Sequence, residues 1–114
     1  MIIKNSKGII ICENAKLADT ILSRMFGLMF TKDLAINEGL IIRPCNSIHT
    51  CFMNYSLDIV FLDRNYSVVK IIYNMKPWRI SWMYFKAFQV LEMKSGGLKI
   101  KLEHGEKLEV LCTN

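Results

Sequence analysis

The chain has 114 residues, 52% of them hydrophobic, which is typical of one domain that buries a core without disulfides or a structural metal. Fifteen basic and ten acidic residues give a formal charge of +5, which favours acidic partners over basic ones. No apolar run approaches the roughly 20 residues of a membrane-spanning helix, and the N-terminus has no signal-peptide pattern. We therefore expect a cytoplasmic protein of a single domain, residues 1–114.

The basic residues are spread along the sequence. The densest group, Lys94, Lys99, Lys101 and Lys107, alternates with glutamates and is typical of a solvated face. The sequence has no zinc-finger spacing, no groove-reading helix and no continuous basic stripe, so we do not expect nucleic-acid binding.

Four cysteines, Cys12, Cys45, Cys51 and Cys112, are expected to be reduced thiols in a cytoplasmic protein. Cys12 and Cys112 lie near the two ends of the chain. A disulfide between them stays open as an alternative if the terminal strands pair.

The first elements in chain order are two short strands over residues 2–5 and 8–12, at hairpin spacing. Apolar residues then recur at helical spacing over residues 17–29, with Asp19 or Thr20 as N-cap and Gly27 as a stop. This run predicts one short helix near the N-terminal third of the chain.

From residue 39 onward the period changes to that of β-strands. The β-branched and aromatic runs cover residues 39–43, 48–52, 57–62, 68–73, 88–93 and 107–111. Turns are expected at residues 63–66 and 104–106. The sequence therefore predicts a mainly β fold, a small antiparallel β-sandwich or barrel, with the helix covering one open end.

A series of motifs resembles a known family. The motifs are Ser23 to Met29, Gly39-Leu40, Pro44-Cys45-x-x-Ile48-His49-Thr50-x-x-Met53, Leu57 to Asp63, Pro77-Trp78-Arg79, Val90-Leu91-Glu92 and Gly105-Glu106. In this order they resemble domain-of-unknown-function family 192, small bacterial and archaeal proteins. The resemblance implies a mainly β, sandwich-like or barrel-like domain, and it implies no activity.

His49 is the first candidate for chemistry, because imidazole titrates near neutral pH and binds metals. On a strand, His49, Cys51 and Met53 would share one face and together resemble a copper ligand set. Residues four apart on a strand are separated by about 13 Å, too far for both to reach one ion. The spacing of Cys45, His49 and Cys51 also matches no common zinc site, so we predict no metal.

Catalysis would need His49 as general base, with Cys45 or Asp58 assisting. Asp58 interrupts an apolar strand, and such a carboxylate needs a partner. We expect a structural ion pair with Arg24 or Arg79 more readily than a catalytic role.

The segment over residues 75–85 is too aromatic for an ordinary solvated loop. Trp78 and Trp82 would stack on a ligand while Arg79 holds its anionic group. Alternatively, the segment contacts a membrane surface or a partner peptide. A third interpretation has the aromatic side chains fold back and cap the end of the sheet.

Together these patterns predict a binding module for a small anionic ligand or peptide, without a cofactor. Its site would be the mouth of the barrel, lined by Arg24, His49, Thr50, Met53, Asp58, Trp78 and Arg79. The alternatives are a hydrolase or transferase that uses His49, and an accessory protein that docks to a larger assembly through residues 78–85.

Overall fold

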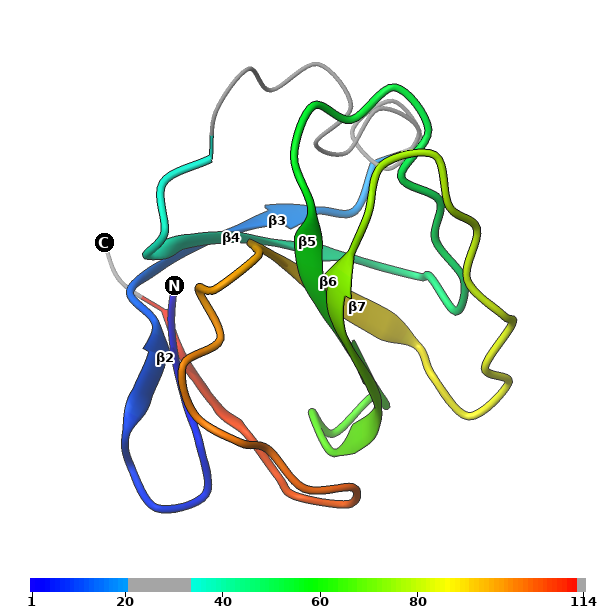
Figure 1. Ribbon diagram of the computed structural model, residues 1–114. Coiled ribbons are helices and arrows are strands. Elements are labelled where there is room, and N and C mark those ends of the chain that lie inside the picture. The colour runs from blue at the N-terminus through cyan, green and yellow to red at the C-terminus, as the bar shows by residue number, and fades with distance from the viewer. Residues whose placement is uncertain (21–33, 113–114) are drawn as a thin grey trace.

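The computed structural model describes residues 1–20 and 34–112 of the chain (Figure 1). In these ranges the chain forms eight strands: β1 (Ile2–Lys4), β2 (Ile10–Cys12), β3 (Asn14–Ala18), β4 (Glu38–Ile42), β5 (Leu57–Leu62), β6 (Val68–Met75), β7 (Gln89–Lys94) and β8 (Glu109–Leu111). The predicted mainly β fold is confirmed. None of the described segments is a helix with the length and hydropathy needed to cross a bilayer.

The strands form two sheets. Three strands pair in the order β2-β1-β8, and five pair in the order β3-β4-β7-β5-β6. All neighbours are antiparallel except β3 and β4, which are parallel. Because only Glu13 separates β2 from β3, the chain passes directly from one sheet to the other. Over the described residues the strands do not close into a barrel, so of the two predicted alternatives, sandwich or barrel, the barrel is wrong, and the strands form two sheets.

The five-stranded sheet carries a hydrophobic cluster on each face. One cluster includes Ile3 and Ile11 of the three-stranded sheet together with Val60 and Leu91 of the larger sheet. The other includes Ile59 and the residues of the loops that cover the far face. Since successive side chains of a strand point to opposite faces, β5 supplies both clusters and all six of its residues are buried.

The predicted helix over residues 17–29 is not supported. Leu17 and Ala18 are the last residues of β3, where they pair with Ile41 and Ile42 of β4. Pairing with a neighbouring strand has overridden the helical spacing at this point, as tertiary contacts often do. The remainder of the predicted helix, from residue 21 onward, lies outside the described residues.

The predicted strand over residues 48–52 is also wrong. Its only bridge joins His49 to Ile80. Phe52 has a φ of 67°, in the left-handed region, which ends any extended run. The segment is therefore a loop, and its backbone is held by the neighbouring loop over residues 76–87.

Both predicted turns are present. Asp63 closes the β5–β6 turn, and its carboxylate Oδ1 accepts hydrogen bonds from the N–H groups of Asn65 (2.8 Å) and Ser67 (2.9 Å). Gly105 has a φ of 85° in the second turn, a conformation that glycine adopts without strain. The predicted hairpin of β1 and β2 is likewise confirmed.

Candidate functional site

Two loops lie side by side beyond the end of the five-stranded sheet, residues 43–56 and 76–87, on the right of the view in Figure 1. The N–H of Ser81 donates to the carbonyl of Ile48 at 2.8 Å, and the N–H of Tyr84 donates to the carbonyl of Asn46 at 2.9 Å. The N–H of Cys45 donates to Phe88 at 2.7 Å. These bonds fix the backbone of residues 76–87, which we call the outer loop, although this segment is not part of a strand.

Thr50 fastens the two loops together from the inside. Its side chain is fully buried, and its hydroxyl donates to the carbonyl of Lys76 at 2.6 Å while accepting from the N–H of Arg79 at 2.9 Å. The backbone of Thr50 donates to the carbonyl of Arg79 and accepts from the N–H of Trp78. Thr50 is thus a structural clamp, and its hydroxyl is already used in these bonds.

Six large apolar side chains of the two loops are exposed to solvent. Their exposed fractions are Phe52 60%, Trp78 59%, Ile80 80%, Trp82 78%, Met83 47% and Phe85 82%. We call these six residues the aromatic platform. Isolated exposed apolar side chains are ordinary on protein surfaces, and a group of six on one pair of loops is a candidate interaction surface.

Two members of the platform have a strained backbone. Phe52 and Trp78 have φ values of 67° and 62°, and each bulky residue in this region costs about 1–2 kcal/mol. Their rings pack together with centroids 4.7 Å apart and an interplanar angle of 60°. Because both side chains remain more than half exposed, burial does not offset the strain. Strain of this kind is concentrated at functional sites.

The net charge of the chain lies in the stretch of sequence that includes most of this platform. Between residues 64 and 91 there are five basic residues and no acidic one, while the rest of the chain has ten of each. The whole formal charge of +5 therefore belongs to this stretch. The basic residues are Arg64, Lys70, Lys76, Arg79 and Lys86, and all are exposed. This stretch is the longest part of the sequence without Asp or Glu. The local density of lysines, which pointed to residues 94–107, does not reveal it.

The residues predicted to line a common mouth do not share one environment. The His49 side chain is exposed, whereas Met53 is buried in the hydrophobic cluster beneath the loops. Trp78 and Arg79 are exposed on the outer loop. Arg24 lies outside the described residues.

Asp58 is a structural carboxylate. It is buried, and its Oδ1 accepts from the N–H of Asn74 at 2.9 Å. Its Oδ2 accepts from the N–H groups of Gly96 at 2.9 Å and Leu98 at 3.3 Å. The expected ion pair with Arg79 is therefore wrong, because backbone amides satisfy this carboxylate. Asp58 links β5 to the edge strand β6 and to the turn after β7.

The catalytic arrangement is likewise not assembled in the described residues. The thiol of Cys45 donates to the carbonyl of Ser47 at 3.1 Å, and the carboxylate of Asp58 is bound by backbone N–H groups. No described hydrogen bond joins His49 to either of them. None of the four cysteines forms a disulfide, and residues 1–20 and 34–112 contain no group of three His, Cys, Asp or Glu side chains placed to hold a metal ion.

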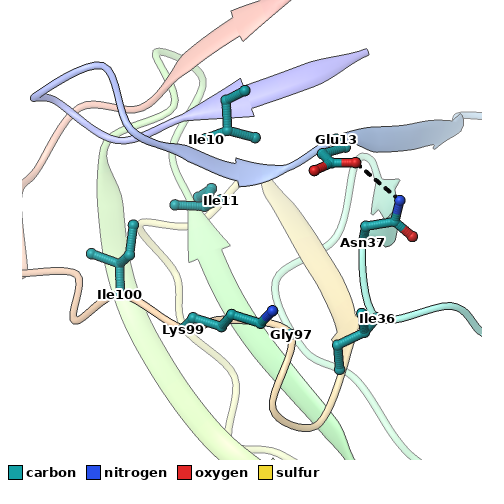
Figure 2. Close-up of a pocket in the computed structure, with 8 residues that line it drawn as sticks. All are labelled: Ile10, Ile11, Glu13, Ile36, Asn37, Gly97, Lys99 and Ile100. Carbon is teal, nitrogen blue, oxygen red and sulfur yellow. Dashed lines mark hydrogen bonds between the residues drawn. The ribbon is translucent and has the colours of Figure 1, made fainter.

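A pocket of about 320 Å³ lies in another part of the molecule, beside β2 (Figure 2). It is lined by Ile10, Ile11, Glu13, Ile36, Asn37, Gly97, Lys99 and Ile100. Figure 2 shows the amide of Asn37 turned toward the carboxylate of Glu13, to which it donates at 3.1 Å. A binding pocket needs polar groups that converge on the ligand. Here the amide of Asn37 and the carboxylate of Glu13 are hydrogen-bonded to each other.

The fold and the surface together define a small two-sheet β protein whose most distinctive feature is a rigid pair of loops with exposed aromatic side chains. By sequence, the chain belongs to the DUF192 family, described as Uncharacterized ACR, which it matches over residues 2–110.

The chain is similar to UPF0127 proteins of archaea. It is 38% identical over 114 residues to UPF0127 protein PH1112 of Pyrococcus horikoshii, covering 96% of this chain and 97% of the relative. It is 33% identical over 118 residues to UPF0127 protein PYRAB11210 of Pyrococcus abyssi, covering 96% of each. The resemblance inferred from the sequence motifs is confirmed.

Two solved structures have the same fold. A protein of unknown function from Novosphingobium aromaticivorans superposes with a TM-score of 0.76 at 26% identity, covering 96% of this chain and 82% of that one. A putative transcription regulator from Sinorhizobium meliloti superposes with a TM-score of 0.78 at 21% identity, covering 95% and 89%. The second likeness shows a shared fold alone.

Proposed function

We propose that this protein is a docking module that binds a negatively charged partner surface through the aromatic platform. The observation that carries this proposal is the exposure of the platform side chains on a backbone that is fixed by hydrogen bonds. A docking role predicts exposed aromatic side chains on this loop, and a role in capping the sheet predicts buried ones.

Charge supports the same proposal. The outer loop carries three basic residues, Lys76, Arg79 and Lys86. The sequence has no Asp or Glu from residue 64 to residue 91. A surface that is both apolar and positively charged favours a negatively charged partner, and its field speeds the encounter.

The first expectation, a small-ligand site at a common mouth, stays a prediction. Three of its proposed residues are already engaged within the protein. Thr50 binds the backbone of the outer loop, Met53 packs in a hydrophobic cluster, and Asp58 binds three backbone N–H groups. The docking proposal uses Trp78 and Arg79, whose side chains are exposed.

In-cell photocrosslinking tests docking without knowledge of the partner. The photoreactive residue p-benzoylphenylalanine replaces Trp82 in one variant and Ile9 in a matched control. Ile9 is a 49% exposed apolar residue on the hairpin of the other sheet. After irradiation, the mass of the purified protein reports whether a protein or a lipid has been attached.

We expect adducts at position 82 that are absent at position 9 and that decrease when Trp78→Ser is added. Equal adduct formation at both positions, or no adduct at either, would overturn the docking proposal. Trp78→Ser serves as the second change because it removes the other exposed tryptophan of the platform.

A further inference from the structure

We propose that the partner surface is an anionic phospholipid bilayer, which the aromatic platform enters at the level of the lipid headgroups. This inference rests on the proposed docking function and names the partner. It makes the chain a peripheral membrane-binding protein that needs no membrane-spanning segment.

The kinds of side chain on the platform match the boundary between water and lipid. Trp82 is an aromatic residue with a polar N–H, a type that concentrates where one end of the side chain is apolar and the other is wet. Ile80 and Phe85 are about as exposed as Trp82, at 80% and 82% against 78%. Side chains that already stand clear of the protein surface can enter the headgroup region without any change in the core.

The lysines distinguish a bilayer from a protein partner. Protein–protein interfaces are enriched in aromatic residues and arginine but depleted in lysine. Here Lys76 and Lys86 lie near the two ends of the outer loop, and both side chains are exposed. On a membrane, a lysine lays its apolar stem along the headgroup region and keeps its ammonium group beside lipid phosphates. Lysine at both ends of an aromatic loop therefore favours a lipid surface.

The distribution of charge favours one orientation on a membrane. The residues outside the stretch from 64 to 91 have as many acidic as basic side chains, so an anionic surface attracts this stretch more strongly than the rest of the molecule. Three of its five basic residues, Lys76, Arg79 and Lys86, lie in the loop that also carries most of the apolar platform. Charge and hydrophobic contact therefore act on the same loop.

The backbone of the platform is organised before binding. The N–H groups of Trp78, Arg79 and Ser81 all donate to the neighbouring loop. A loop that is already ordered loses little conformational entropy when it binds, so more of its contact free energy contributes to affinity. This arrangement differs from a disordered basic segment, which must be ordered at the membrane.

Vesicle binding tests the inference. The protein is mixed with vesicles made of equal parts of phosphatidylglycerol and phosphatidylcholine, and separately with vesicles of phosphatidylcholine alone. Trp78 and Trp82 are the two tryptophans of the chain and both belong to the platform, so their emission reports directly on its environment. We expect sedimentation with the anionic vesicles and a shift of the emission to shorter wavelength.

Variants separate insertion from simple charge attraction. We expect Trp82→Ser to abolish most of the sedimentation, and Ile9→Ser, its exposed control on the other sheet, to leave it unchanged. Arg79→Gln should lower the partition coefficient about fivefold, the effect of one basic residue near an anionic membrane. Lys101→Gln, an exposed lysine outside the basic stretch, should have little effect.

The outcomes distinguish lipid binding from docking in general. No sedimentation of wild-type protein with anionic vesicles overturns the lipid inference, and so does sedimentation that Lys101→Gln weakens as much as Arg79→Gln. A platform-specific crosslink to a protein, without vesicle binding, leaves the docking function standing with another partner. Absence of both results overturns both proposals.

Discussion

The rings of Phe52 and Trp78 lie 4.7 Å apart at an interplanar angle of 60°, and both residues have left-handed backbone conformations. The two residues come from different loops, 26 positions apart in the sequence, and Thr50 hydrogen-bonds to the loop that carries Trp78. A pair of exposed aromatic rings is thus held in place by a buried threonine.

Thr50→Val should destabilise the protein by about 1–3 kcal/mol, because it keeps the shape of the side chain but removes the hydroxyl that bonds to residues 76 and 79. The measurement is the free energy of unfolding in urea. Thr50→Ser, which keeps the hydroxyl, should lie closer to wild type than the valine variant. Equal stability of wild type and Thr50→Val would show that the clamp contributes nothing.

Trp78→Asn should reduce vesicle binding while leaving the free energy of unfolding nearly unchanged. Asparagine tolerates the left-handed region, which offsets the loss of a ring pair of about 0.5–1.5 kcal/mol. Urea unfolding and vesicle sedimentation of the same preparation measure the two effects. A large loss of stability would contradict this expectation, because it would mean that Trp78 is needed for folding.

Asp58→Ala should lower the free energy of unfolding by about 2–4 kcal/mol, since three backbone N–H groups lose their acceptor at a buried position. The exposed Asp19 provides the control, and Asp19→Ala should stay within about 0.5 kcal/mol of wild type. Full stability of Asp58→Ala would reopen a functional role for this carboxylate.

The stability of the protein should fall as the pH rises from about 4.5 to about 7. Burial raises the pKa of Glu92 from 4.5 to about 7, so in this range the folded chain holds a proton that the unfolded chain has lost. By linkage, stability decreases with pH wherever the folded state binds more protons. A difference of this size between the pKa values of the folded and unfolded chain corresponds to about 3 kcal/mol of folding stability.

Glu92→Gln should remove most of this pH dependence and make the protein more stable at pH 8, since the glutamine needs no proton to remain neutral. Urea unfolding at several pH values provides the measurement. Glu109→Gln changes an exposed glutamate on β8 and should leave the pH dependence as in wild type. If Glu92→Gln and wild type fall in parallel with pH, another group is responsible.

The strands were predictable where the chain is buried on both faces or closed by a local turn. β5 has the predicted bounds, because its run is apolar apart from Asp58 and rich in β-branched and aromatic residues, and the turn after it is set by the Asp63 side chain. β3 was missed because its partner is parallel and lies far along the chain. Only tertiary pairing decides between a strand and a helix at Leu17 and Ala18.

The sequence predicts which types of residue the candidate site contains, but not which groups their side chains contact. The aromatic loop and a membrane or peptide contact were among the interpretations of the sequence. The partners of Thr50 and Asp58 are backbone groups, and a sequence gives no sign of which backbone group a polar side chain will meet. For this reason the sequence could not show that Thr50 and Asp58, both assigned to the predicted mouth, bond to backbone groups.

The pairing of β1 with β8 has a consequence for how the chain folds. Ile2 lies opposite Leu111, so the three-stranded sheet joins segments from the two ends of the sequence. During synthesis, the β1–β2 hairpin can pair with β8 only after the intervening residues 13–108 have been made. Because such distant contacts slow folding, the face of β5 and β7 that this small sheet covers is the last apolar surface to be protected, and a nascent chain is most exposed to aggregation there.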